Sequence, residues 1–158
     1  MTSESLLETD AVISDTSCFI LLEKINELAL LKECFRVVYT TPTVAAEFGI
    51  SLPDWVQVRE VMDKTYLKGI SALADPGEIS VIALAGELPD CLLILDDDKV
   101  RKVAQSFNLR FTGTLGVLVR AKALGKLTVL SPIIDKIRST DFRASDSLLA
   151  KTLKSVDE

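Results

Sequence analysis

The sequence contains no histidine, and this absence narrows the chemistry that the protein can perform. Ser-His-Asp triads, Cys-His pairs and zinc sites with histidine ligands are all excluded. Cysteine is scarce as well, since Cys18, Cys34 and Cys91 are an odd number, far apart and in apolar surroundings. We therefore expect three buried, reduced thiols, and any chemistry has to come from carboxylates, hydroxyls, lysine or arginine.

Long apolar runs are also missing, because none approaches the roughly 18 residues of a membrane span. The first ten residues are acidic and lack the positive region of a signal peptide. We interpret residues 1–10 as a short N-terminal arm on a cytoplasmic protein. With 158 residues, of which 48% are hydrophobic, the chain is expected to form a single domain over residues 1–158 with a sizeable core.

Basic residues are rare in the first part of the chain and common in the last. Residues 1–98 carry 18 of the 23 acids and 6 of the 18 lysines and arginines, so the two parts have net charges of −12 and +7. An acidic centre beside a basic surface suits a metal-dependent nuclease, which has to hold phosphates. Basic helices that simply pack over an acidic half would give the same asymmetry.

Short β-branched runs alternate with helical patterns along the chain. Strands are expected at 11–14, 35–40, 55–61, 91–95 and 109–112, and helices at 18–31, 42–48, 79–88, 99–107, 117–124 and 145–154. This alternation predicts an α/β fold with a central parallel sheet of about five strands and helices on both faces.

Acidic residues recur where these strands end. Asp15 follows the first strand, and the consecutive carboxylates Asp96, Asp97 and Asp98 follow the run 91–95. Glu47 and Glu78 occupy early turns of helices that begin at the same edge of the sheet. Because all parallel strands end at one edge, these acids are expected to converge.

Each acid also has a local explanation. Asp15 is a suitable N-cap, and Asp75 with Glu78 three residues later forms an Asp version of the capping box. Glu47 lies too deep in its helix for a capping box and is otherwise a solvated helical side chain. Taken as a set, converging carboxylates without histidine favour Mg²⁺ or Mn²⁺ over zinc or copper, and such a cation assists phosphodiester hydrolysis.

The order of motifs resembles the PIN-domain family, most closely its prokaryotic branch related to virulence-associated ribonuclease toxins. The resemblance covers residues 11 to about 145. It rests on Ile13 to Ser17, Pro42 to Glu47, Asp75 to Glu78 with Ile82 to Ala85, Leu93 to Asp97, and Thr112 to Gly116.

The resemblance implies a three-layer α/β/α PIN-like fold and a Mg²⁺- or Mn²⁺-dependent endoribonuclease. Such proteins are commonly homodimers and are often toxins inhibited by a cognate antitoxin. By position, the implied catalytic residues are Asp15, Glu47, Glu78 and Asp97; the metal ligands are Asp15, Glu78 and Asp97, with Asp96 as the neighbouring alternative; and the polar supports are Thr16, Ser17 and Thr114. Glu78 departs from the pattern, because many members have Asp there.

The basic residues after the triple Asp are candidates for steering an RNA backbone. They are Lys99, Arg101, Lys102 and Arg110, and a solvated helix face would explain them equally well. A catalytically inactive PIN-like binding or assembly module is the alternative function. A receiver domain would need a lysine after a late strand, and a haloacid-dehalogenase-like phosphatase would need an Asp-x-Asp pair near Asp15; the sequence has neither.

Overall fold

A computed structural model describes residues 10–158, so the expected arm lies outside the described residues except for Asp10. The first half of the described chain contains β1 (Ala11–Ser14), α2 (Thr16–Lys24), α3 (Ala29–Cys34), β2 (Val37–Thr40), α4 (Pro42–Phe48), β3 (Val56–Val58) and α5 (Lys64–Ile70). The second half contains α6 (Pro76–Glu87), β4 (Cys91–Ile94), α7 (Asp98–Ser106), β5 (Phe111–Thr112), α8 (Thr114–Ala123), α9 (Ser131–Arg138) and α10 (Asp146–Ser155).

The five strands form one parallel sheet in the order β3-β2-β1-β4-β5. The predicted parallel sheet is therefore confirmed. β1 and β4 lie in its centre, are buried along their whole length and are paired from Ala11 with Cys91 to Ser14 with Ile94. β3 forms one edge of the sheet, and only three residues of the expected strand 55–61 belong to it.

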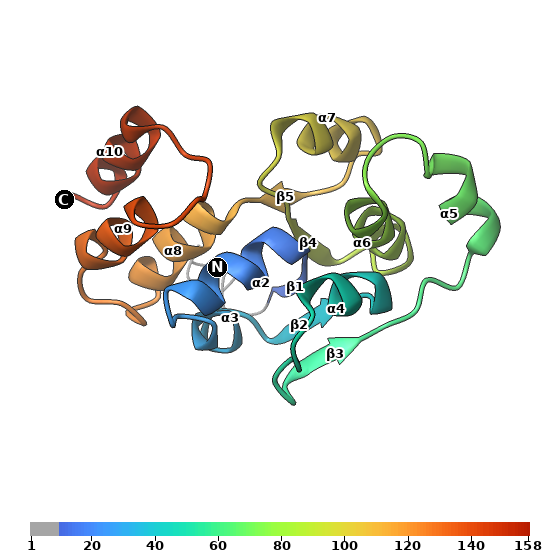
Figure 1. Ribbon diagram of the computed structural model, residues 1–158, viewed down its shortest axis with the longest axis horizontal. Coiled ribbons are helices and arrows are strands. Elements are labelled where there is room, and N and C mark those ends of the chain that lie inside the picture. Colours follow the sequence, from blue (N-terminus) through green and yellow to red (C-terminus); the bar gives the residue numbers. More distant parts are fainter. Residues whose placement is uncertain (1–9) are drawn as a thin grey trace.

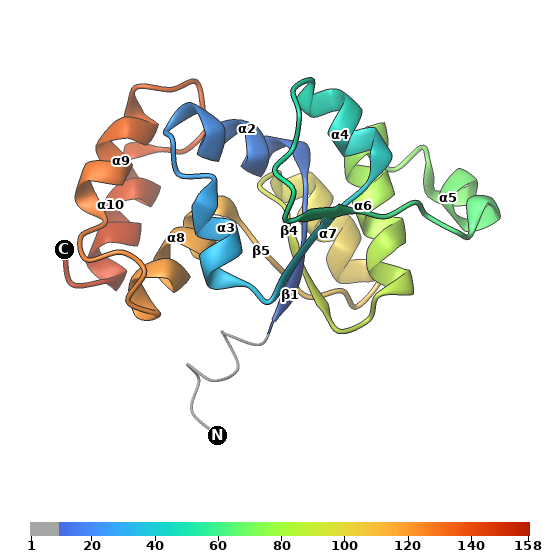
Figure 2. The ribbon, with the colours of Figure 1, turned by 90° about the horizontal axis from the view of Figure 1, so that it is seen from below.

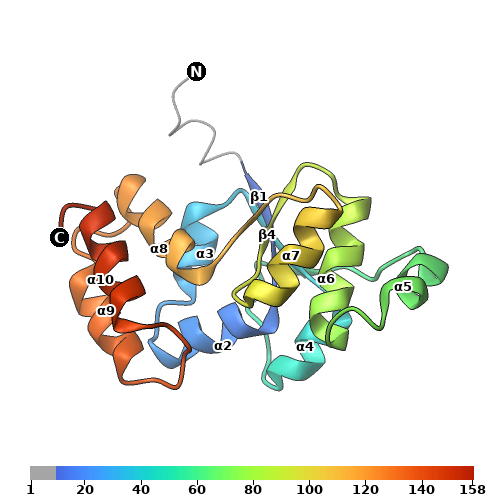
Figure 3. The same cartoon turned by 90° about the horizontal axis from the view of Figure 1, so that it is seen from above.

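Helices cover both faces of the sheet, which gives the expected three layers (Figure 1). Turned views place α3 and α8 on one side of the sheet and α6 and α7 on the other (Figures 2 and 3). The pair α9 and α10 lies outside α8, and the linker between them returns toward α2.

The helix expected over 18–31 is wrong as a single element, because it breaks after Lys24. Asn26 adopts a left-handed conformation with φ 59°, which asparagine tolerates better than most residues. The amide of Asn26 then donates to the Glu23 carbonyl at 3.1 Å and that of Glu27 to the Leu22 carbonyl at 2.8 Å. These two bonds form a Schellman motif that ends α2 and turns the chain into α3.

The predicted caps of the early helices are confirmed. Thr41 accepts a hydrogen bond from the Val44 amide at 3.2 Å, Pro42 begins α4, and Gly49 ends it with φ 80°. Asp75 accepts from the Glu78 amide at 2.9 Å and so begins α6. Local sequence chemistry therefore determines where these helices start, and with it where their acids lie.

Cys18, Cys34 and Cys91 are free and buried, as expected. Burial raises the pKa of all three thiols, that of Cys34 to about 11, which keeps them protonated. Among residues 10–158, no helix has the length and apolar character required to cross a membrane.

Candidate functional site

The acids lie where the strand order reverses. β1 pairs with β2 on one side and with β4 on the other, so the connections leaving β1 and β4 run to opposite sides. In open α/β sheets a crevice forms at the carboxyl ends of the strands at this switch point. Asp15 directly follows β1, and Asp96 comes two residues after the end of β4.

Asp15 is the most buried acid of the site, with 3% of its surface exposed. Its carboxylate accepts a hydrogen bond from the Cys18 amide at 3.0 Å, so it caps α2 as the local pattern predicts. Desolvation by burial, followed by the negative charge of Asp96, raises the pKa of Asp15 well above its usual range, and Glu78 adds to this rise. No cation forms an ion pair with Asp15 among residues 10–158.

Asp96 is held by the start of α8. One carboxylate oxygen accepts from the Thr114 amide at 2.7 Å and the other from the Thr114 hydroxyl at 2.6 Å. Gly113 leaves the room for this approach, because a Cβ there would overlap with Asp96 and with the guanidinium of Arg101. Thr114, expected to be a polar support, is thus the residue that orients Asp96.

Asp97 and Glu78 lie at the outer part of the same edge. Asp97 is exposed and caps α7 through the Lys99 amide at 2.8 Å. Desolvation by burial and the neighbouring carboxylate of Asp75 raise the pKa of Glu78 to about 8, and the charge of Asp97 contributes further. The sequence marked Asp75 only as a helix cap, so this interaction with the Glu78 carboxyl group was missed.

Glu47 contacts a different part of the edge. Its carboxylate accepts from the Thr16 hydroxyl at 2.5 Å and lies against Gly77, where any Cβ would overlap with it. A buried hydroxyl pair continues beneath this contact, with 2.6 Å between the side-chain oxygens of Thr41 and Ser80. Glu47 is therefore joined to Asp15 and Glu78 through their chain neighbours, while Ser17 is exposed and faces a pocket.

Within residues 10–158, no three acidic or cysteine side chains form a ready-made metal-binding group. These carboxylates take part in hydrogen bonds instead, since Asp96 accepts from Thr114, Asp97 from the start of α7 and Glu47 from Thr16. The chemistry of the donors nevertheless fits a hard divalent cation. Asp15 and Asp96 are neighbouring oxygen donors, and the buried Asp15 has no ion pair with any residue of 10–158.

The basic residues expected to bind RNA divide into two groups. The Arg101 guanidinium donates to the Leu95 carbonyl at 2.7 Å and lies over the Phe111 ring, 5.5 Å from its centre. Arg110 donates to the Asp90 carbonyl at 3.2 Å. Both arginines thus have contacts that fix the β4 and β5 region, whereas Lys99 and Lys102 are exposed on α7.

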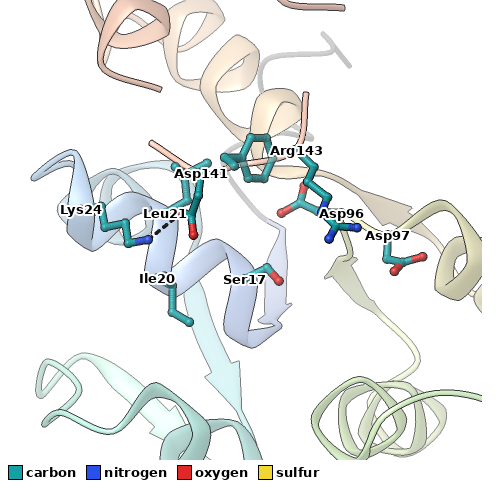
Figure 4. Close-up of a pocket in the computed structure, with 9 residues that line it drawn as sticks. Ser17, Ile20, Leu21, Lys24, Asp96, Asp97, Asp141 and Arg143 are labelled. Atoms are coloured by element: carbon teal, nitrogen blue, oxygen red, sulfur yellow. Dashed lines mark hydrogen bonds and ion pairs between the residues drawn. The ribbon is translucent and has the colours of Figure 1, made fainter. Parts of the chain in front are cut away.

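A pocket of about 360 Å³ opens beside Asp96 and Asp97 (Figure 4). α2 supplies one wall, and the linker between α9 and α10 supplies the other. The lining residues are Ser17, Ile20, Leu21, Lys24, Asp96, Asp97, Asp141, Phe142 and Arg143. The linker residues were missed in the sequence, where they form a short polar stretch without a recognisable motif.

Comparison with known proteins identifies the family of the chain. No curated protein sequence matches the chain. A family model described as a PIN domain matches residues 11–158, which include the whole sheet and all the acids of the site. The chain therefore belongs to the PIN-domain family.

Proposed function

We propose that the protein is a Mg²⁺- or Mn²⁺-dependent endoribonuclease whose site is formed by Asp15, Asp96, Asp97 and Glu78. The family supports nuclease chemistry in general, since PIN domains are generally nucleases that use divalent metals. The observation that carries the proposal for this chain is Asp15, a carboxylate buried beside Asp96 with no cationic partner in the described part of the chain.

Asp15 and Asp96 would hold the cation, with Asp97 and Glu78 at its outer side. The bound cation would lower the pKa of a water and neutralise charge on the phosphoryl group. Thr114 orients Asp96 through two hydrogen bonds, and the Cys18 amide orients Asp15. Glu78, whose pKa is raised to about 8 in the metal-free site, would give up its proton when a cation binds and would then face the cation as a charged carboxylate.

Three further assignments follow from the resemblance and belong to the same proposal. They are a toxin role with a cognate antitoxin, a homodimer and a cytoplasmic location. Glu47 is proposed as a catalytic residue of the set, acting from its position against Thr16 and Gly77.

The test is cleavage of a mixed pool of end-labelled RNA with Mg²⁺, with Mn²⁺ and with EDTA. We expect internal cleavage with either metal, none with EDTA and none by Asp15→Asn. Asp54→Asn is the matched control, because Asp54 is exposed and has no hydrogen bond or ion pair among the described residues. Equal cleavage by wild type and Asp15→Asn would contradict the proposed site.

The second candidate is a catalytically inactive PIN-like module that binds or assembles with other molecules. The missing ready-made metal group within residues 10–158 favours it, as do the two hydrogen bonds by which Thr114 occupies both oxygens of Asp96. Such a module has no need of a cation. A rise in melting temperature with added Mn²⁺ that disappears in Asp15→Asn would count against it.

A further inference from the structure

Two pockets open on Asp96 from opposite sides of the linker between α9 and α10. The first is the 360 Å³ pocket against α2. The second, of about 640 Å³, lies between β5, α8 and α10. Asp96, Phe142 and Arg143 line both pockets, so the linker forms a partition that stands over the acids.

Arg143 is a residue of this partition whose side chain does not help to hold the linker in place. It is exposed and forms no hydrogen bond or ion pair with any described residue. Its side chain extends from the linker toward Asp96 and Asp97 (Figure 4). A guanidinium beside uncompensated carboxylates, but not paired with them, is available for an anion that binds next to those carboxylates.

The linker is held in place without Arg143. Asp141 forms an ion pair of 2.7 Å with Lys24 of α2. The Thr140 hydroxyl donates to the Ile137 carbonyl at 2.7 Å and accepts from the Phe142 amide at 3.2 Å. The position of Arg143 is therefore set by its neighbours, and replacing its side chain should leave the partition intact.

We propose that Arg143 binds a phosphate of single-stranded RNA above the acids, and that the two pockets take the nucleotides on either side of that phosphate. This inference rests on the proposed ribonuclease function and adds the substrate-positioning residue to it. Each pocket combines apolar side chains, such as Ile20 and Leu148, with a lysine, Lys24 or Lys151. Bases that enter such pockets must be unpaired, and Phe142 at the junction offers a ring for stacking.

The arrangement of a pocket on each side of Asp96 also predicts which bonds of the RNA strand are cut. A strand that occupies both pockets passes over Asp96 and continues in both directions, so the bond beside the acids is internal to the strand. A single closed pocket would instead hold a strand end. The geometry therefore favours endonucleolytic cleavage over the removal of terminal nucleotides.

The test measures binding of a fluorescein-labelled 12-nucleotide single-stranded RNA by fluorescence anisotropy with Mg²⁺ present. All proteins carry Asp15→Asn, so that the probe is not cut. Adding Arg143→Ala should weaken binding roughly tenfold, and the salt dependence should fall by about the 0.7 expected for one lost phosphate contact on a single strand. Arg143→Lys should restore part of the affinity.

The control is Lys32→Ala, which removes the same charge from the exposed face of α3 and from neither pocket. We expect it to change the dissociation constant less than twofold. Melting temperatures of all variants check that the fold is unchanged. A second readout compares unlabelled competitors, and an eight-nucleotide oligouridylate should compete at least roughly tenfold better than uridine monophosphate, because it fills both pockets.

Several results would overturn the inference. Equal losses for Arg143→Ala and Lys32→Ala would reduce Arg143 to a general charge, and tighter binding by Arg143→Ala would show that it blocks the site. If uridine monophosphate competed as well as the oligouridylate, the proposal that RNA occupies both pockets would be wrong. If wild type cleaves RNA, but Arg143→Ala changes neither binding in the Asp15→Asn background nor cleavage in the wild-type background, only the inference fails. If wild type neither binds nor cleaves RNA, the proposed function fails with it.

Discussion

Two aspartates lie at the two ends of the central strand β1, and their charged neighbours and burial differ. Asp10 precedes β1 and pairs with Arg120 at 3.0 Å, while Arg110 lies 3.9 Å away. The side chains of Asp10 and Arg120 are only 18% and 14% exposed, so the pair is largely removed from water. Asp15 follows β1, is buried more deeply and faces Asp96 instead of a cation.

Under the proposed function, the difference separates an acid that supports the fold from an acid of the site. A carboxylate that only supports a fold is stabilised by a cation of the same chain, as Asp10 is. A carboxylate that is buried beside another carboxylate destabilises the metal-free protein, and under our proposal Asp15 has this position because it binds a cation. Arg120 shows that the chain can place a cation near β1, because it pairs with Asp10. Its guanidinium also lies 4.9 Å from the centre of the Phe35 ring.

The strongest way to break this comparison is to neutralise Asp15. Asp15→Asn should lower the cleavage rate by roughly 10³-fold, an effect of the size found when one charge-stabilising group is removed from an active site. The same variant should melt at a higher temperature than wild type in EDTA, because asparagine keeps the helix cap and removes the buried charge. Lower stability together with retained cleavage would make Asp15 a structural residue.

Neutralising Asp10 should have the opposite effects, a loss of stability with little change in cleavage. Asp10→Asn leaves Arg120 without its partner, and we expect a loss of about 2 kcal/mol in the free energy of unfolding. Cleavage per folded molecule should stay within about twofold, since a site at the far end of the strand is untouched. Urea unfolding and a cleavage assay on the same sample measure both. A large loss of cleavage without a loss of stability would contradict the assignment.

The acids at the carboxyl ends of the strands should also make the stability of the metal-free protein depend on pH. The pKa of Glu78 is raised from 4.5 to about 8, so the folded protein binds more protons than the unfolded chain between these values. Its free energy of unfolding should therefore fall as pH rises from about 4.5 to about 8, and Asp15 acts in the same direction.

After allowance for solvent screening, we expect the Glu78 contribution to this fall to be on the order of 1–2 kcal/mol. Urea unfolding in EDTA at a series of pH values measures it. Glu78→Gln should flatten the profile, and added Mg²⁺ should do so as well by favouring the charged carboxylates. A profile that rises over this range would show that another group controls it.

The smallest expected effect concerns α7, where the sequence places the RNA contacts. Lys102→Ala should weaken binding of the 12-nucleotide RNA by about twofold, as expected for an exposed cation that acts only through the general field. Lys99→Ala should behave in the same way. A loss of affinity as large as that caused by Arg143→Ala would show that the substrate contacts lie on α7.

Much of the edge could be predicted because it depends on short-range rules. Strand ends, helix caps and the order of acids are local in the sequence, and they brought Asp15, Asp96 and Glu78 to one edge. The break at Asn26 was missed because the apolar spacing continues across it, and only a positive φ reveals the turn. Two kinds of information were not local at all.

The first is the orientation of Asp96 by Thr114, 18 residues further along the chain, which distinguishes Asp96 from Asp97. The second is Arg143, which is brought to the acids by the packing of α9 and α10 and by the Lys24 to Asp141 ion pair, residues 117 positions apart. Long-range contacts of this kind leave no periodicity in the sequence. The basic bias after residue 98 indicated a cationic surface without indicating which residue forms it.

The most direct test of the central claim is calorimetric titration of Mn²⁺ into wild type and into Asp15→Asn, with cleavage of an RNA pool measured on the same samples. We predict that wild type binds Mn²⁺ and cleaves, and that both activities are lost in the variant. Wild-type protein that neither binds Mn²⁺ nor cleaves RNA would contradict the account and identify the chain as an inactive member of its family.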